Sequence, residues 1–196
     1  MGMILDTNHA HIAHLRSLVK KEPKAVLIGT FSIYAGILHD GEDSHSWGGK
    51  YENEIHNILD DLVETPNVRI LVGFPPLNLC VPNCEECLYK HQKWAMRLLK
   101  HVEKWPQFQW RIIEEFHLKC YLFFYNDIPP EGIGGGRNLT TSNWTDASIV
   151  LNKKQVLKMG ELFAKSWSKA GEVNEEALDA ITMRQIDGAN KNAERQ

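Results

Sequence analysis

Residues 117–125 read HLKCYLFFY, and the glycine-rich stretch GGGRN follows at 134–138. The first stretch is almost continuously apolar after its polar start, which is typical of a buried strand. Because side chains alternate between the two faces of a strand, His117 and Lys119 should project to one side and Cys120 to the other, into the core. An imidazole and an ammonium side by side at the start of a strand suit an anionic phosphate.

The downstream stretch adds groups that can hold the same anion. Glycines such as Gly135 and Gly136 let backbone N–H groups approach an anion closely, and Asn138 adds a neutral amide donor. The set fits displacement at a phosphodiester, with His117 as the nucleophile. The lysine and the asparagine would stabilise the negative charge of the transition state. This chemistry requires no catalytic metal.

The predicted reaction needs two histidines, because one of them must protonate the leaving oxygen. One chain offers a single set, so a two-fold homodimer is the simple way to supply the second histidine. The His-x-Lys pattern recurs at His91 and Lys93, but in a predicted helix, where positions i and i+2 point about 200° apart. No glycine–asparagine stretch follows that copy. The alternative for His117 and Lys119 is a half-exposed strand that begins with polar residues.

The pattern resembles the signature of the phospholipase D superfamily, in which His-x-Lys precedes an aspartate and then Gly-Ser-x-Asn. The matching residues are His117, Lys119, Gly135, Gly136 and Asn138. Asp146, with the apolar stretch after it, is similar to the acidic residue of single-motif nucleases in this family, and it joins the catalytic set on that basis. The resemblance covers roughly residues 10–170. It implies a mixed β-sheet flanked by helices, one active-site motif per chain, and dimers.

Two positions depart from the family signature. Phe124 stands where the family has its aspartate, and Gly136 stands where it has its serine. In such proteins the aspartate is more a structural support than a catalytic group, and the serine adds one hydroxyl donor near the phosphate. The departures leave open a second class of function, that of a catalytically weak member which binds nucleic acid or another protein.

Apolar periodicity predicts an α/β protein, because helices and strands alternate along the chain. The predicted helices span residues 8–20, 51–64, 86–104 and 153–170. The predicted strands span residues 25–31, 67–74, 108–115, 117–125 and 147–151. We assign residues 1–171 to one domain, and residues 172–196 to a tail with a short helix and a disordered end. His9, His11 and His14 are expected on the surface of the first helix rather than as metal ligands.

Three cysteines and a histidine have the spacing of a metal site: Cys80, Cys84, Cys87 and His91. Such a cluster in a reducing compartment indicates metal ligands before disulfides, and these four residues form a complete tetrahedral zinc set. A closed site of this kind is structural and would fix the loop over residues 74–86. A CCCH module occurs at a similar place in the zucchini-like branch of the superfamily, whose members resemble RNA or single-strand nucleases. The alternative is three reduced, partly buried cysteines and a helix histidine.

A basic stripe, spaced by three and four residues, follows one face of the predicted helix 86–104: Lys90, Lys93, Arg97, Lys100 and Lys104. These cations could track the backbone of a nucleic acid. The alternative is an ordinary solvated helix face. Trp94, beside the stripe, is more typical of packing than of base stacking.

Composition limits the possible partners. The chain has 196 residues, 43% of them hydrophobic and 24% charged, and a net charge of −3, so any nucleic acid must bind to a local patch. The first residues have no basic segment followed by a long apolar run, and the apolar stretches are strand-sized. We therefore expect a cytoplasmic protein without a membrane segment.

The sequence thus predicts a metal-independent phosphodiesterase, a homodimeric nuclease that cleaves DNA or RNA through a phosphohistidine, with a structural zinc ion. The alternative of another class is a phospholipase D-like interaction protein. A phospholipid-acting enzyme is less favoured, because the chain shows one motif and no membrane segment.

Overall fold

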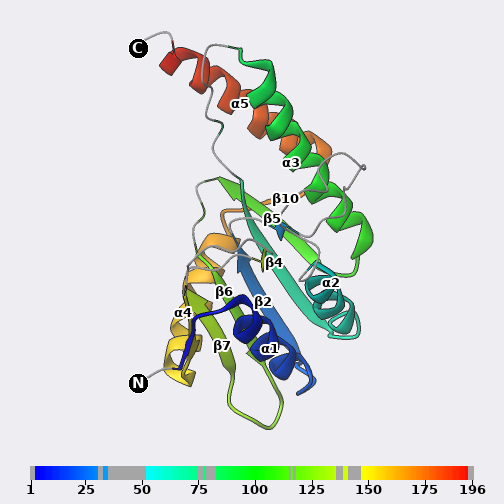
Figure 1. The fold of residues 1–196 in the computed structure, drawn as a ribbon, viewed down its shortest axis with the longest axis vertical. Helices are drawn as coiled ribbons and strands as arrows, with labels where there is room; N and C mark the ends of the chain where they lie inside the picture. Colours follow the sequence, from blue (N-terminus) through cyan, green and yellow to red (C-terminus); the bar gives the residue numbers. More distant parts are fainter. Residues whose placement is uncertain are drawn as a thin grey trace.

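An eight-stranded mixed β-sheet forms the centre of the protein in the computed structural model (Figure 1). The structure describes residues 3–30, 33–34, 52–74, 77, 83–114, 116, 118–135, 139–140 and 147–193. The strands of this sheet are β1 (Ile4–Leu5), β2 (Ala25–Thr30), β4 (Asn67–Phe74), β5 (Gln109–Glu114), β6 (Cys120–Phe124), β7 (Glu131–Gly135), β9 (Ser148–Leu151) and β10 (Gly171–Glu172). Their order across the sheet is β1-β9-β7-β6-β2-β4-β5-β10. Two further strands, β3 (Ile33–Tyr34) and β8 (Leu139–Thr140), pair with each other in parallel.

The strand directions bring several strand ends to one edge of this sheet. Strands β2, β4 and β5 are parallel, whereas β6 is antiparallel to β2, β7 to β6, and β9 to β7. The C-terminal ends of β2, β4, β5 and β7 therefore meet the first residues of β6 and β9. We call this the site edge; its described residues include Thr30, Phe74, Glu114, Lys119, Gly135 and Ser148.

Helices cover both faces of the sheet (Figure 1). One core joins the sheet to α1 (Asn8–Val19), α2 (Glu52–Asp61) and α3 (Glu85–Lys104), and a second core joins the opposite face to α4 (Lys153–Trp167). A fifth helix, α5 (Glu175–Ala193), lies along α3. The predicted α/β class and the mixed sheet flanked by helices are confirmed. None of the described helices is long and apolar enough to span a bilayer.

The side chains of β6 alternate as the sequence predicted. Tyr121 and Phe123 belong to the core under α1, α2 and α3, whereas Cys120 and Leu122 belong to the core under α4. The Cys120 thiol is fully buried, and burial raises its pKa to about 12. Cys120 is therefore a core residue, as expected from the alternation.

Three element boundaries differ from the prediction. The polar, proline- and glycine-containing segment 126–132 (NDIPPEG) is typical of a turn in the sequence, but β7 already begins at Glu131. Gly132 packs so closely on β6 that a Cβ atom would lie 2.7 Å from the carbonyl oxygen of Tyr121. Strand β6 begins at Cys120, three residues later than expected. Helix α5 runs to Ala193, far beyond the short helix predicted in the C-terminal segment, because its apolar side packs against α3.

Candidate active site

The hairpin of β6 and β7 carries the described part of the predicted site. The backbone N–H of Gly135, the last residue of β7, donates a hydrogen bond to the carbonyl oxygen of Lys119 (3.2 Å). Lys119 immediately precedes β6, and its side chain is partly exposed. Two residues that the sequence placed in one site, sixteen positions apart, are thus joined directly at the site edge.

Gly135 is the residue at which glycine is structurally required. Its φ is +135°, in a region that side chains rarely adopt, and a Cβ atom would lie 2.8 Å from the carbonyl oxygen of Ala147. Ser148, the partner of Gly135 in β9, is buried. The end of β7 and the start of β9 therefore pack backbone against backbone, with Lys119 on the other side of β7.

Four members of the predicted site lie outside the described residues: His117, Gly136, Asn138 and Asp146. Their described neighbours in the chain, Phe116, Leu118, Gly135 and Ala147, belong to the site edge or adjoin it. The structure therefore joins Lys119 to Gly135, and the roles of the other four residues stay predictions.

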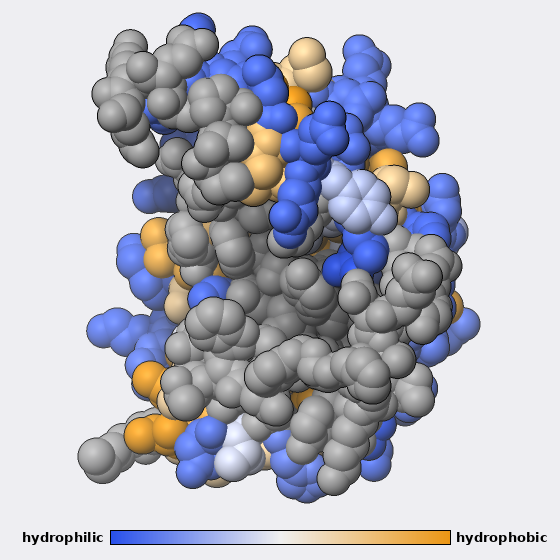
Figure 2. Space-filling model, turned by 45° about the horizontal axis from the view of Figure 1, so that its top comes forward, coloured by the Kyte–Doolittle hydropathy of each residue, from blue (hydrophilic) through white to orange (hydrophobic). Residues whose placement is uncertain are grey.

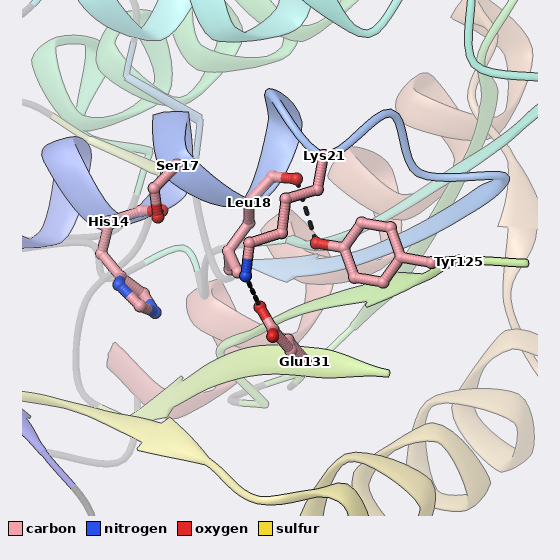
Figure 3. Close-up of polar contacts among 6 residues, drawn as sticks. All are labelled: His14, Ser17, Leu18, Lys21, Tyr125 and Glu131. Atoms are coloured by element: carbon pink, nitrogen blue, oxygen red, sulfur yellow. Dashed lines mark hydrogen bonds and ion pairs between the residues drawn. The ribbon is translucent and has the colours of Figure 1, made fainter. Parts of the chain in front are cut away.

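Contacts at the opposite end of the hairpin hold it against α1 (Figure 3). The Tyr125 hydroxyl, just after β6, donates a hydrogen bond to the carbonyl oxygen of Leu18 (3.0 Å). Lys21 forms an ion pair with Glu131, the first residue of β7. Burial, and then the negative charge of Glu131, raise the pKa of the Tyr125 hydroxyl above its ordinary value. The hairpin is thereby fixed at its turn while its open end carries Lys119 and Gly135.

A buried polar group lies under the site edge, and sequence reasoning missed it. The Tyr121 hydroxyl is hydrogen-bonded to the side chain of Thr30, the last residue of β2, and both residues are almost completely buried. The ring of His11 meets Tyr121 edge to face, with 5.2 Å between ring centroids. His11 is 5% exposed, so its expected place on the helix surface was wrong. The sequence feature that could have indicated this buried pair was the presence of Tyr121 and Thr30 in otherwise apolar strands.

Three residues of the predicted zinc set are described, at the start of α3. Cys84 precedes the helix, Cys87 lies in its first turn, and both are half-buried thiols. His91 is buried against the ring of Phe74, with 4.9 Å between centroids. Its Nε2 atom is buried without a hydrogen-bond partner in the described structure, and burial lowers its pKa, which favours the neutral imidazole that binds metals.

A buried, neutral imidazole nitrogen without a partner fits a metal ligand, and Cys84 and Cys87 are the thiols that the sequence spacing assigned to the same set. Cys80 lies outside the described residues. Among the residues that are described, no group of three or more His, Cys, Asp or Glu is gathered as a metal site. The zinc ion therefore stays a proposal.

The basic stripe lies on the solvent side of α3. Lys93, Arg97 and Lys100 are partly exposed and Lys104 is exposed, whereas Trp94 is buried against Phe74, which confirms its predicted packing role. The stripe ends far from the site edge, where the Lys104 ammonium lies 4.5 Å from the centroid of the Trp105 ring. The side chain of Lys90, near the start of the stripe, is outside the described residues.

The acidic residue at the end of β5 is neutralised from α5. The Arg184 guanidinium donates to the Glu114 carboxylate at 2.7 Å. This ion pair reduces the negative potential that Glu114 would otherwise place at the site edge. It also ties α5 to the sheet at β5, which β2 and β4 separate from the hairpin that carries Lys119.

No known protein family model and no curated protein matches the sequence. A solved structure of phosphatidylserine synthase from Haemophilus influenzae Rd KW20, a phospholipase D-like protein, matches 97% of this chain and 46% of its own, at 13% identity and a TM-score of 0.60. The archaeal chromatin protein TrmBL2, whose structure shows a mode of DNA binding, matches 88% of this chain and 54% of its own, at 14% identity; its TM-score of 0.44 is too low to carry an argument. The chain thus spans about half the length of each of these two proteins. The protein therefore has the fold of the phospholipase D-like superfamily.

Proposed function

We propose that the chain is a phosphodiester hydrolase, a nuclease that cleaves DNA or RNA through a phosphohistidine intermediate on His117. The observation that carries the proposal is the hydrogen bond between Gly135 and Lys119. It holds an ammonium-bearing residue against a glycine with a positive φ at the open end of a hairpin. Such an edge, with a cation and close-packed backbone, suits a phosphate group.

The proposed reaction has two steps. In the first, a ring nitrogen of His117 attacks phosphorus, the bond from phosphorus to the leaving oxygen breaks, and the same histidine of a second copy gives that oxygen a proton. In the second, water attacks the phosphohistidine and passes a proton to the second histidine, and the phosphorus–nitrogen bond breaks. Lys119 and Asn138 stabilise the charge on the phosphoryl oxygens. Asp146 holds the tautomer of His117.

The departure from the family signature at Phe124 lies away from the site edge, so it is compatible with the proposed activity. Phe124 ends β6 at the hairpin turn, whereas Lys119 precedes the first residue of the same strand. Its ring packs in the core under α4, 3.8 Å from the position that a Cβ atom would take at Gly160. Phenylalanine at this position therefore replaces a core contact and takes no group away from the site edge.

The proposed substrate is a nucleic acid because α3 supplies cations on a solvent-facing surface. Arg97 and its neighbours in the stripe would pair with successive phosphates, since spacing along one helix face matches a linear polyanion. A phospholipid is the second candidate substrate, because the solved structure with the same fold is a phosphatidylserine synthase. The alternative function is that of a protein which binds nucleic acid without cleaving it. In that case, binding should not depend on His117.

We also propose that Cys80, Cys84, Cys87 and His91 hold a structural zinc ion. The unpartnered, buried Nε2 of His91 supports this proposal. When bound, zinc would join the start of α3 to the preceding segment and take no part in the reaction. Because its ligands lie at the start of the helix that carries the basic stripe, a bound zinc ion would hold that helix in a fixed position relative to the site edge.

The decisive experiment incubates the purified protein, in EDTA, with labelled single-stranded DNA, single-stranded RNA, duplex DNA and phosphatidyl-lipid vesicles. We expect cleavage of a nucleic acid by the wild type and its loss in His117→Ala. His9→Ala is the matched control, because His9 is exposed on α1. An acid-labile phosphoryl label on the wild type, absent from His117→Ala, would identify the intermediate. Tight binding of a nucleic acid with no cleavage of any substrate would overturn the enzyme proposal. Hydrolysis of the lipid but not of the nucleic acids would make a phospholipid, and not a nucleic acid, the proposed substrate.

A further inference from the structure

A pair of arginines lies on the sheet face that α4 covers. Arg69 is the third residue of β4, and Arg111 is the third residue of β5. In the register of these parallel strands, Arg69 lies beside Gln109 and Arg111 lies beside Leu71. The two arginines are therefore diagonal neighbours that project to one face. Leu71 belongs to the core under α4, which identifies that face.

Both guanidiniums lie against the side chain of Trp167, the last residue of α4. The Cζ atom of Arg111 is 4.9 Å from the centroid of the indole ring, and the Cζ atom of Arg69 is 5.7 Å from it. The carbonyl oxygen of Trp167 accepts a hydrogen bond from Arg111 (2.8 Å). The Phe163 ring stacks on the same indole, with 5.6 Å between centroids. A fixed indole thus holds two cations at one place.

These two cations form no ion pair within the part of the chain that the structure describes. The carboxylates of Glu114 and Glu131 pair with cations elsewhere. Glu172 lies opposite Arg111 in the β5–β10 register, and its side chain is exposed to solvent rather than ion-paired with that arginine. Like charges held close together repel each other unless an anion lies between them. The arginine pair is therefore suited to an anionic ligand.

The accessible atoms of the pair indicate which kind of anion fits. Trp167 is half-buried and already packed on Phe163, so its ring is a poor stacking surface for a base. Arg69 is exposed, and Arg111 uses one of its N–H groups on the Trp167 carbonyl oxygen. The other N–H groups form planar forks, which bind a phosphate through two parallel hydrogen bonds. A phosphate group therefore fits this site better than a base does.

We propose that Arg69 and Arg111 bind a phosphate of the nucleic-acid strand, at a position remote from the bond that is cleaved. The choice of a nucleic acid rests on the proposed function, whereas the arginine pair rests on the geometry around Trp167. Arg111 is three residues before Glu114, roughly 10 Å along β5 from the site edge. Strands β4 and β2 lie between β5 and β6, which adds roughly 14 Å across the sheet. A strand of several nucleotides spans this separation, and a dinucleotide does not.

The arginine pair is separate from the basic stripe of α3. Helix α3 packs on the opposite face of the sheet from α4, so the two sets of cations would contact one strand from the two faces. In the view of Figure 2, the described surface is mostly hydrophilic and only small apolar groups interrupt it. That surface offers a partner charged groups more than apolar area, which suits a polyanion.

The test measures the binding of a fluorescein-labelled thymidine strand of about sixteen nucleotides by fluorescence anisotropy, at a series of salt concentrations. The full chain carries His117→Ala, so that the strand is not cleaved during the measurement. We expect Arg69→Gln to weaken binding about three- to tenfold and to reduce the salt dependence by about 0.7 in log K per log salt, the value for one phosphate contact of a single strand. Arg69→Lys should keep the salt dependence, because the charge remains, and should lose part of the affinity, because an ammonium has no planar fork.

Lys154→Gln is the matched control, since Lys154 is an exposed cation at the other end of α4. It should change neither the affinity nor the salt dependence. Thermal unfolding checks that each variant is folded. In the chain that retains His117, Arg69→Gln should lower kcat/KM for the long strand and leave cleavage of a dinucleotide unchanged.

Failure of this inference and failure of the proposed function are distinguishable. If Arg69→Gln binds the strand as tightly as its parent, or if Lys154→Gln weakens binding equally, the arginine site is overturned and the nuclease proposal stands. Binding that depends on Arg69 in a chain that cleaves nothing supports the arginine site and overturns the proposed function. A chain that binds no strand overturns both.

A lipid phosphate is the other source of the same chemical group. Vesicles of phosphatidylcholine with phosphatidylglycerol test it, in a sedimentation assay with the same variants. If Arg69→Gln lowers binding to the vesicles and not to the strand, a nucleic acid is overturned as the ligand. Vesicle binding that is absent, or equal in Arg69→Gln and its parent, supports the nucleic acid.

Discussion

The backbone N–H of Gly135 donates to the carbonyl oxygen of Lys119, and this bond joins the last residue of β7 to the residue before β6. It closes the open end of a hairpin whose turn is held against α1 by Tyr125 and Glu131. The described part of the candidate phosphate site, Lys119 and Gly135, therefore lies at the open end of a hairpin that is held at its other end.

Replacing Gly135 with alanine should destabilise the protein by about 2–4 kcal/mol, because the change combines a strained φ with a Cβ atom 2.8 Å from a backbone oxygen. Gly188→Ala is the matched control, since nothing lies within 4 Å of its Cβ position on α5. That change should stabilise the protein by about 0.5–1 kcal/mol. Urea unfolding measures both. Equal effects at the two glycines would contradict the geometry described for β7.

Replacing Lys119 with alanine should lower kcat by about a hundredfold or more, because a group that stabilises transition-state charge is lost. Lys24→Ala is the control: Lys24 is exposed at the other end of the sheet, beside Phe124. Single-turnover cleavage separates the chemical step from binding. A loss confined to KM would assign Lys119 to substrate binding and contradict a role in the reaction.

Acid should destabilise the protein through His101, which is fully buried on α3. Burial lowers its pKa from the ordinary value of 6.5 to about 4, opposed by the hydrogen bond to the carbonyl oxygen of Arg97 and assisted by the positive charges of His56, Lys104 and Arg97. Between these two values the unfolded chain binds a proton that the folded chain does not. The free energy of unfolding should therefore fall by about 3 kcal/mol as the pH drops from 6.5 to 4.

His101→Gln should reduce this dependence, whereas His9→Gln, at an exposed position, should keep it. Urea unfolding at a series of pH values gives the slope for each variant. If the free energy of unfolding of His101→Gln depends on pH as steeply as that of the wild type, another group controls acid unfolding.

Zinc removal should lower the melting temperature if the proposed metal set is correct. We expect about one zinc per chain by elemental analysis, and its loss in Cys87→Ser and in His91→Ala, because each supplies one of four ligands. Cys120→Ala is the matched control, since that thiol is buried in the core under α4. A protein that folds without zinc and takes up none on titration would contradict the metal site. It would favour the alternative of reduced cysteines and a buried histidine.

The hydroxyl of Tyr121 should contribute to stability through its bond with Thr30. Tyr121→Phe leaves a buried threonine without this partner, so we expect a loss of about 1–2 kcal/mol. Tyr89→Phe, at a residue 62% exposed on α3, should have little effect. Thermal unfolding followed by circular dichroism compares the two variants. Equal melting temperatures would contradict a stabilising role of the Tyr121 hydroxyl.

The sequence by itself determined α1 to α4, five of the strands (β2, β4, β5, β6 and β9), and the two faces of β6. Mainly apolar stretches such as the second half of Asn67–Phe74 indicate strands that are buried on both faces, and the alternation in β6 placed Cys120 in the core. Those signals are local, because they depend on the period of side-chain direction along one element. The fold class followed from them and from the order of the signature residues.

The tertiary structure decided what depends on contacts between distant segments. Gly132 and Gly135 form part of a strand despite their low strand propensity, because neighbouring backbones leave no room for a side chain. His11 is buried because Tyr121 lies across from α1. A groove between α3 and α5 forms where the apolar side of α5 packs along α3, and no pattern in either helix alone specifies that pairing.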